Sequence, residues 1–230
     1  MCFHLSISKK ANNLENRYKA KFEQDYNQLF HANGFTLLDY PVISSEDSSV
    51  FNYYSWGLKP HWAKDDNIRT KTLNARSETV YEKPSFRDSI KQRRCLIPVT
   101  GFFENHTSGK IKQPYHIFLK SEEIFSLAGI WAEWTNRDNG EITKTFSILT
   151  TDANPLLAEI HNLKKRMPVI IPRKNESDWI DIELPKDDIL ELCKPYDEKD
   201  MSAYKVSRDL NSKSINSNKA EILEELNELF

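Results

Sequence analysis

The segment RRCLIPVTGFFEN, residues 93–105, contains an apolar run from Cys95 to Phe103, which lies between two arginines and the polar pair Glu104 and Asn105. The run is rich in β-branched and aromatic residues, which are enriched in strands. We therefore predict a strand that is too apolar to be exposed, with Glu104 at its end.

Further runs of similar composition lie on both sides of this segment. Two polar stretches, Ser108 with Gly109 and Thr135 to Gly140, separate neighbouring runs. Such stretches are typical of hairpin turns and therefore predict antiparallel neighbours. The additional predicted strands are Val50–Trp56, Tyr115–Leu119, Ile124–Trp131, Thr145–Thr150 and Pro168–Ile171.

Helical patterns occur beside these strands. Asn154 and Pro155 supply an N-cap and a first-turn proline for a helix through Ile160, and Pro185 to Leu192 predicts another short helix. Near the amino terminus, apolar residues recur every fourth position among polar ones, which predicts an amphipathic helix packed on the sheet. That stripe comprises Leu14, Tyr18, Phe22, Tyr26 and Phe30.

The combined pattern predicts an α+β fold with a barrel-like, mainly antiparallel β-sheet core and peripheral helices. No internal repeat or low-complexity linker divides the sequence, so we expect a single domain over residues 1–230. Residues 212–230 are a candidate peripheral helical tail, because Ile222, Leu226 and Leu229 have helical spacing. A terminal helix this short is marginal by itself.

The composition gives little sign of a special partner or compartment. The 32 Lys and Arg against 34 Asp and Glu give a formal net charge of -2, so any nucleic-acid surface must be local. The three cysteines, Cys2, Cys95 and Cys193, fit neither a disulfide framework nor a paired zinc motif. Without a signal sequence or a long apolar run, we expect a cytoplasmic protein that is not in a membrane.

Cys2 is the first residue whose position suggests chemistry. It follows Met1, and removal of that methionine would leave an α-amine and a thiol on adjacent carbons. Such a pair converts an aldehyde first to an imine and then to a five-membered thiazolidine. At pH 7 the neutral fraction of an α-amine exceeds that of a lysine by roughly 500-fold. The position alone also fits a buried hydrophobic residue at the start of a strand.

Several further segments place polar residues in apolar or tightly turned surroundings, and together they resemble one family. With MC at the start and WGLKPHW at 56–62, the chain resembles the SOS response-associated peptidase (SRAP) family from Cys2 to about Arg208. The other segments are TLNARSET (72–79), RRCLIPVTGFFEN (93–105), FSLAGIWAEW (125–134) and IHNLKKRMPVII (160–171).

The resemblance implies a sensor or shield of abasic sites in single-stranded DNA. In this family the cysteine exposed by methionine removal forms a thiazolidine cross-link with the ring-opened deoxyribose. Cys2 then matches the nucleophile, Asn74 the residue that orients cysteine and sugar, Glu104 the catalytic glutamate and His161 the active-site histidine. A carboxyl and an imidazole in one pocket supply the proton transfers that this chemistry needs. On local grounds alone, each of these side chains also fits a structural role.

Four residues are candidate DNA contacts: Arg76, Trp62, Lys165 and Arg166. On an extended segment, Arg76 shares a face with Asn74, which suits a phosphate contact beside the sugar. Aromatic faces that stack on bases, together with cations that follow phosphates, are typical of single-strand binders. Short charge runs are also common on solvated faces that bind nothing.

The sequence departs from the common family pattern at three places. Phe3 and His4 follow Cys2 where glycine and arginine are usual, and Asn105 replaces a tryptophan after the glutamate. The histidine motif is longer than usual, because residues 162–165 separate His161 from the RMP sequence. The extra residues extend a loop and add two cations that could change contacts with the DNA.

Two other functions remain open from the sequence. A cysteine peptidase, acting on other proteins or on its own Met1, would use Cys2 with Glu104 and His161. A non-covalent single-strand-binding module would need only the basic residues. Cys2 and His4 fall short of a metal ligand set, so we expect no metal and no cofactor. A monomer that meets the replication machinery at damaged DNA is the default expectation.

Overall fold

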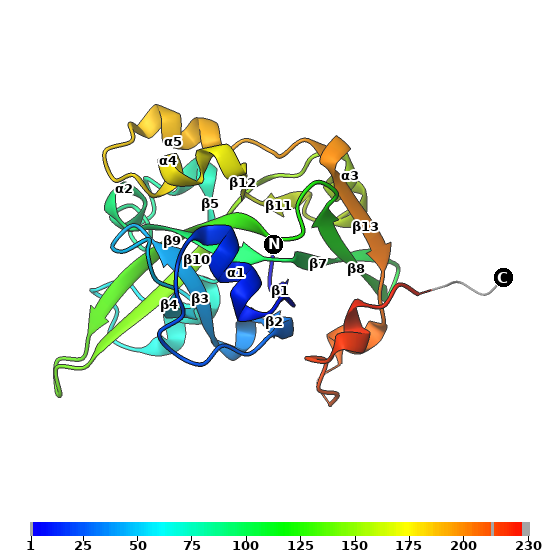
Figure 1. Cartoon of the computed structure of the whole chain (residues 1–230), viewed down its shortest axis with the longest axis horizontal. Coiled ribbons are helices and arrows are strands. Elements are labelled where there is room, and N and C mark those ends of the chain that lie inside the picture. Colours follow the sequence, from blue (N-terminus) through cyan, green and yellow to red (C-terminus); the bar gives the residue numbers. More distant parts are fainter. Residues whose placement is uncertain (1, 213, 227–230) are drawn as a thin grey trace.

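The computed structural model describes residues 2–212 and 214–226, and its strands form two sheets (Figure 1). The strands are β1 His4–Ile7, β2 Leu29–Asn33, β3 Asp39–Ser44, β4 Asn52–Trp56, β5 Asn74–Arg76, β6 Arg94–Val99, β7 Gly101–Ser108, β8 Ile111–Leu119, β9 Phe125–Thr135, β10 Ile142–Asp152, β11 Arg166–Pro168, β12 Ile170–Ile171 and β13 Met201–Lys205.

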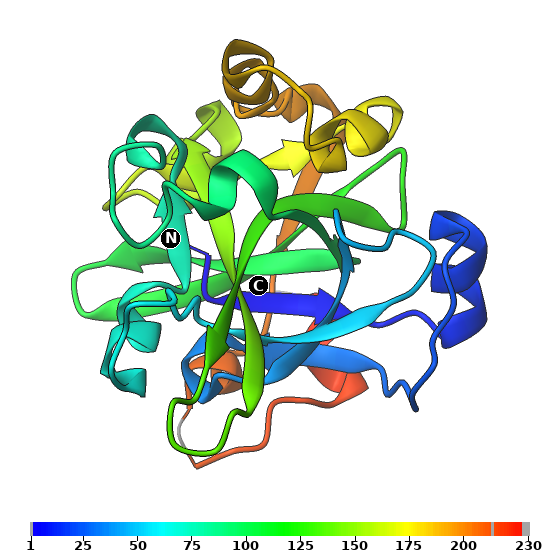
Figure 2. The same ribbon diagram turned by 90° about the vertical axis from the view of Figure 1, so that its left-hand side faces the viewer.

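The helices are short. The α-helices are α1 Ala11–Tyr18, α2 Ser89–Gln92, α3 Pro155–Ile160, α4 Glu176–Ile180 and α5 Lys186–Leu192. Short 3-10 helices span Gly34–Thr36, Asp66–Lys71, Ser77–Thr79, Arg173–Asn175, Glu198–Asp200, Arg208–Asn211 and Ala220–Leu223. Two perpendicular views place α4 and α5 together at one end of the molecule and α1 at its side (Figures 1 and 2). No helix in the described part is long and apolar enough to cross a membrane.

The larger sheet closes on itself. Its order is β11-β10-β4-β3-β6-β9-β12, and an additional antiparallel pairing of β9 with β10 closes β10, β4, β3, β6 and β9 into a ring. The second sheet has the order β13-β8-β7-β1-β2 and is antiparallel throughout. The predicted α+β, barrel-like, mainly antiparallel architecture is therefore confirmed.

The segment 93–105 links the two sheets. The predicted single strand Cys95–Phe103 is two strands, because the chain turns at Thr100 from β6 in the barrel to β7 in the second sheet. Thr100 donates its backbone N–H to the Ser6 carbonyl (2.8 Å), and a side chain at Gly101 would lie 2.2 Å from His116 Nε2. Only glycine lets β7 approach β8 so closely at this corner.

Arg94 shows how the core accepts a charge. Its side chain is fully buried, and its guanidinium donates to the carbonyls of Trp179 (2.6 Å), Ile90 (2.8 Å), Lys91 (3.0 Å) and Asp181. These carbonyls replace the water that burial removes. Arg94 therefore holds α2 and α4 against β6.

The predicted helix with the stripe from Leu14 to Phe30 is only partly correct. Helix α1 ends at Tyr18, since Lys19 adopts a left-handed conformation (φ 57°). Beyond it, Phe22 stacks on Phe51 at a centroid distance of 4.0 Å, and Phe30 belongs to β2. The four-residue spacing of these apolar side chains therefore reflects separate contacts with other parts of the chain and not one helix face. Tertiary packing outweighs the local helical preference here.

The predicted helical tail is also different. Residues 220–223 form one 3-10 turn, and the chain is extended again at Glu224. Ile222 is buried with Phe103, Val206 and Leu210, so packing on the second sheet replaces helix continuation. Residues 227–230, which include Leu229, lie outside the described residues. The predicted helices after Asn154 and Pro185 and both hairpin turns are present.

Candidate functional site around Cys2

Strand pairing fixes the chain on both sides of the amino-terminal strand. Strand β1 lies between β7 and β2, with His4 opposite Phe103 on one side and Asn33 on the other. The Phe3 carbonyl also accepts the N–H of Gly34 at 2.8 Å. Cys2, two residues before the first residue of this strand, is thereby brought near Glu104, which follows Phe103.

Cys2 is buried rather than displayed. Its side chain has no exposed surface, and its Sγ lies 3.9 Å from the His4 carbonyl oxygen. Burial, and secondarily the negative charge of Glu104, raise the pKa of the Cys2 thiol well above its ordinary value. The thiol is therefore protonated at neutral pH, and a base must take its proton before sulfur can attack.

Glu104 is such a base. Only 6% of its surface is exposed, and burial raises its pKa from 4.5 to about 7. A carboxyl group with a pKa near 7 exists in both protonation states at neutral pH. It can therefore accept a proton in one step and donate one in another.

His161 lies against Glu104 at the end of α3. Asn154 caps this helix by accepting the N–H of Leu157 (2.9 Å), and the His161 N–H bonds to the Leu157 carbonyl (2.8 Å). His161 Nδ1 lies 3.8 Å from Glu104 Oε1 and 2.9 Å from the Arg166 carbonyl oxygen. A carbonyl only accepts, so we infer that Nδ1 carries a proton and that Nε2 holds the lone pair. Burial lowers the pKa of His161, which keeps the ring neutral at pH 7.

Asn74 begins β5, which runs parallel to β10 with Asn74 opposite Ile148. Both polar atoms of its amide are buried, and neither has a hydrogen-bond partner among residues 2–212 and 214–226. An unpartnered buried amide costs about 1–3 kcal/mol, so native structures rarely retain one without a functional reason. No hydrogen bond links Asn74 to a described residue of the site.

A cavity of about 170 Å³ opens over Glu104 and His161. Its wall combines apolar, amide and cationic side chains. The lining residues are Phe3, Glu104, Asn105, Thr107, Lys112, His161, Leu163 and Lys164.

The loop after His161 forms one wall of this cavity. The Asn162 side chain accepts the N–H of Thr107 (3.1 Å) and donates to its carbonyl (2.8 Å), much as a neighbouring strand would. Lys164, one of the two cations that the longer loop adds, has a charge that acts on both Glu104 and His161. In the sequence, the extra length of the loop after His161, and not a motif, was the feature that could have predicted this wall of the cavity.

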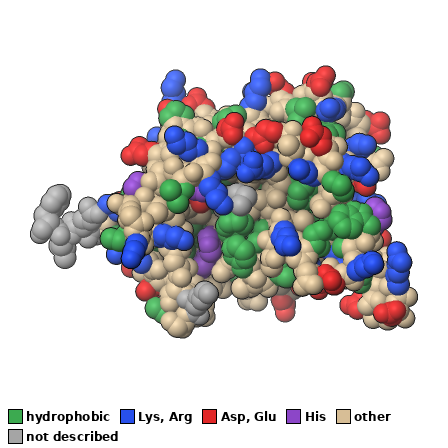
Figure 3. Space-filling model, turned by 180° about the vertical axis from the view of Figure 1, so that it is seen from behind, with side chains coloured by type: hydrophobic (Ala, Val, Ile, Leu, Met, Phe, Trp, Pro, Cys, Tyr) green, Lys and Arg blue, Asp and Glu red, His purple; other side chains and the backbone are tan. Residues whose placement is uncertain are grey.

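The four predicted DNA contacts lie in different environments. Arg76 is exposed at the end of β5, and Lys165 is exposed in the loop with a left-handed backbone (φ 48°). Trp62 is 45% exposed, and its Nε1 donates to the Pro84 carbonyl at 3.4 Å. Lys and Arg side chains gather in the upper middle of one face, beside hydrophobic side chains (Figure 3).

Arg166, by contrast, is only 6% exposed, and its two terminal nitrogens are bonded to other groups, whereas its buried Nε has no hydrogen-bond partner in the described part of the chain. Its guanidinium forms a two-pronged ion pair with Glu78, at 2.5 and 3.0 Å. It also contacts Asp152 (2.8 Å) and donates to the Thr150 carbonyl (2.7 Å). These bonds position the backbone whose carbonyl holds His161 Nδ1.

All three cysteines lie in the described part of the chain and are free and buried. Within that part, no group of three or more His, Cys, Asp and Glu side chains could hold a metal ion.

Fold and site together define a barrel-like α+β protein with a buried amino-terminal cysteine beside a carboxyl and an imidazole. The family model "SOS response associated peptidase (SRAP)" matches residues 1–213, so the chain belongs to this family. Abasic site processing protein YoqW of Bacillus subtilis is 41% identical over 178 residues, which are 76% of this chain and 78% of that protein. Abasic site processing protein HMCES of Gallus gallus is 29% identical, with coverages of 84% and 64%.

Solved structures support the same assignment. A crystal structure of a protein from Bacteroides thetaiotaomicron has a TM-score of 0.92 and 40% identity, and covers 98% of this chain and 100% of its own. A protein from Bordetella bronchiseptica has a TM-score of 0.77 at 22% identity, covering 90% of this chain and all of its own. The second likeness concerns the fold alone.

Proposed function

We propose that this protein processes abasic sites in single-stranded DNA by forming a covalent thiazolidine cross-link through Cys2 after Met1 has been removed. The observation that carries the proposal is the convergence of a buried cysteine, a carboxyl with a pKa near 7 and a neutral imidazole beside one cavity. The names of the relatives support the same substrate.

The proposed reaction needs no oxidant or cofactor. The Cys2 α-amine adds to the C1′ aldehyde carbon of the ring-opened deoxyribose, so that a C–N bond forms and the carbonyl oxygen becomes a hydroxyl. Loss of that hydroxyl as water gives an imine. The Cys2 sulfur then adds to the imine carbon, and the thiol proton moves to the nitrogen, which closes the ring.

The surrounding groups receive distinct roles in this proposal. Glu104 takes the proton from the amine or thiol and returns one to the departing hydroxyl. The lone pair on His161 Nε2 accepts the proton of a sugar hydroxyl. Asn74 supplies the hydrogen bonds that its amide lacks in the free protein to the sugar and to Cys2.

DNA binding in this proposal is local, because the net charge is -2. Arg76 and Lys165 contact phosphates and Trp62 stacks on a base. Arg166 acts indirectly, since its side chain is already engaged by Glu78 and Asp152. The protein would act as a monomer in the cytoplasm and be associated with the nucleoid while bound to damaged DNA.

The test is a cross-linking assay with a single-stranded oligonucleotide that carries one abasic site. Wild-type protein should give an adduct that survives heat and detergent, and Cys2→Ala should give none. A matched strand with a tetrahydrofuran in place of the abasic sugar has no aldehyde and should also give none. The proposal fails if wild-type protein forms no adduct although its mass shows that Met1 is absent.

The peptidase reading applies most directly to the protein's own Met1. The bond to be cut precedes Cys2, next to which Glu104 and His161 lie, and the family description itself names a peptidase. The intact mass of wild type and Glu104→Gln, expressed with and without an aminopeptidase inhibitor, separates self-cleavage from removal by another enzyme. Retention of Met1 only in Glu104→Gln would support self-cleavage.

A further inference from the structure

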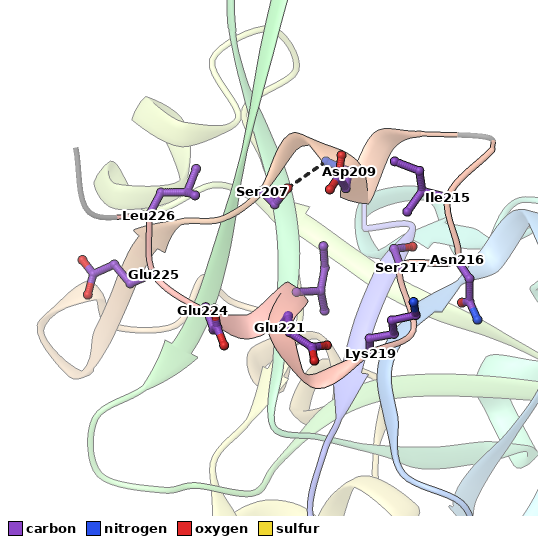
Figure 4. Close-up of a pocket in the computed structure, with 11 residues that line it drawn as sticks. Ser207, Asp209, Ile215, Asn216, Ser217, Lys219, Glu221, Glu224, Glu225 and Leu226 are labelled. Carbon is purple, nitrogen blue, oxygen red and sulfur yellow. Dashed lines mark hydrogen bonds between the residues drawn. The ribbon is translucent and has the colours of Figure 1, made fainter. Parts of the chain in front are cut away.

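A carboxy-terminal segment, residues 207–226, described at 207–212 and 214–226, extends past residue 213, where the family match ends. It leaves β13 and folds back over the second sheet, and part of it lies beside β2 (Figures 1 and 2). Ile222 anchors it, because this side chain is only 5% exposed and packs with Phe103 and Leu210. The segment curves around a cavity of about 470 Å³ that it lines by itself, with Ser217 on its wall (Figure 4).

The segment is hydrogen-bonded to β2, the edge strand of the second sheet. Asn218 Oδ1 accepts two backbone N–H groups of that strand, from Phe30 (2.8 Å) and His31 (3.2 Å). An edge strand otherwise leaves such groups unpaired. Asn218 therefore takes the place of a further strand at this point.

Three side chains that are hydrogen-bonded in a row lead from the segment to β1, near the amino terminus. Ser217 Oγ lies 2.6 Å from His31 Nδ1, and His31 Nε2 lies 2.8 Å from His4 Nδ1. Burial lowers the pKa of His31 to about 4 and that of His4 to about 3, so both rings are neutral at pH 7. With Ser217 donating, His31 donates in turn to His4, and the orientation of every ring is fixed. His4 is two residues from Cys2.

The same segment also reaches the strand that carries Glu104. The side-chain amides of Asn105 and Asn211 bond reciprocally: Asn211 Nδ2 donates to Asn105 Oδ1 (2.8 Å), and Asn105 Nδ2 donates to Asn211 Oδ1 (3.3 Å). Asn105 is adjacent to Glu104 and lines the cavity of the site. The segment thus contacts β7, which carries Glu104, and β2, which pairs with β1.

We propose that residues 207–226 are a clamp that positions Cys2 against Glu104, with Ser217, Asn218 and Asn211 as its positioning residues. The inference rests on the proposed cross-linking function. β2 holds residues 3 and 4 through Gly34 and Asn33, so fixing β2 fixes the backbone next to Cys2. A displacement of about 1 Å between reacting groups can lower a rate by up to about 100-fold.

The test uses the full chain with the double variant Ser217→Ala, Asn218→Ala and the single variant Asn211→Ala. Ser217→Thr with Asn218→Asp keeps the hydroxyl and the acceptor oxygen, and Glu224→Gln changes an exposed residue of the same segment. Three quantities are measured for each: the cross-linking rate constant at saturating abasic strand, the affinity for the tetrahydrofuran strand, and the melting temperature.

We expect the double variant to cross-link about tenfold more slowly while its affinity for the tetrahydrofuran strand changes less than about twofold. The conservative double variant and Glu224→Gln should stay within about twofold of wild type. A double variant that cross-links at the wild-type rate overturns the clamp alone. The clamp alone is also overturned if the unfolded fraction at the assay temperature fully accounts for the loss of rate. Absence of any adduct with wild-type protein overturns the proposed function and the clamp together.

Discussion

Glu104 Oε1 lies 3.8 Å from His161 Nδ1, close enough for electrostatic interaction but beyond hydrogen-bond distance. The imidazole proton on Nδ1 instead goes to the Arg166 carbonyl at 2.9 Å. Burial acts in opposite directions on the two groups, because it raises the pKa of Glu104 and lowers that of His161. His161 is therefore largely neutral at pH 7 and Glu104 is divided between its two protonation states, so the two groups do not form a fixed carboxylate–imidazolium pair with each other.

This arrangement predicts the pH dependence of cross-linking. Replacing Glu104 by Gln removes a general base, and the rate constant should fall by about 100-fold or more at pH 8. The wild-type carboxyl loses its basic form as the pH falls through about 7, so the advantage of wild type should shrink below that pH. The ratio of the two rate constants, measured from pH 5.5 to 8.5, cancels the titration of the α-amine and should rise through about pH 7. A ratio independent of pH would contradict this role.

Glu104→Gln should raise the stability of the protein, although it lowers the cross-linking rate. The pKa of Glu104 is about 7 in the folded chain and 4.5 ordinarily, so folding disfavours the charged form and stability is lost as the pH rises from about 4.5 to about 7. At about 1.4 kcal/mol per pH unit, the loss approaches about 3 kcal/mol. Glu104→Gln should therefore have a higher melting temperature than wild type at pH 8 and a similar one at pH 4.5. Thermal unfolding at both pH values, with Glu82→Gln as an exposed control, checks this.

The fold was predictable where the apolar run of a segment and the turn residues beside it indicate the same element. The apolar runs near Val50, Ile124 and Thr145 became β4, β9 and β10, because continuous apolar runs and, between β9 and β10, a hairpin turn specify them. Strand β13 and the split at Thr100 were missed, since both depend on contacts with residues far away in the sequence. The apolar stripe that begins at Leu14 predicted too long a helix for the same reason. Phe22, beyond the end of α1, stacks on Phe51 and does not belong to a helix face.

The site was predictable only through the family motifs. No spacing in the sequence shows that Cys2 and Glu104 meet, because that contact depends on the pairing of β1 with β7. Motifs also do not show which bonds an arginine already makes within the protein. Arg166 stays a predicted DNA contact, and in the structure its guanidinium is bonded to Glu78 and Asp152.

Asn74 should show a conflict between stability and activity. Its buried amide has no hydrogen bond to a described residue, so Asn74→Ala removes about 1–3 kcal/mol of desolvation cost while losing some packing. We expect the melting temperature to stay the same or rise, whereas the cross-linking rate constant should fall at least tenfold. Thermal unfolding and single-turnover cross-linking of the same preparation check this. Ser147→Ala serves as the control for stability alone. It removes a buried hydroxyl that, like the Asn74 amide, has no hydrogen-bond partner in the described part of the chain. A strongly destabilised Asn74→Ala would mean that the amide has a structural role.

Arg76 and Arg166 should respond oppositely to the same substitution. Arg76 is exposed, so Arg76→Ala should change the free energy of unfolding by less than about 0.5 kcal/mol. If its charge contacts a phosphate, binding to the tetrahydrofuran strand weakens, and the slope of log affinity against log salt becomes shallower by about 0.7.

Arg166→Ala instead leaves the Thr150 carbonyl and Glu78 without their partner and should cost about 2 kcal/mol of stability. Because the Arg166 carbonyl orients His161, its cross-linking rate should fall more than its affinity for DNA. Salt-dependent binding and denaturant unfolding of both variants separate the two roles. A stable Arg166→Ala with a shallower salt slope would show instead that Arg166 leaves Glu78 to bind phosphate directly.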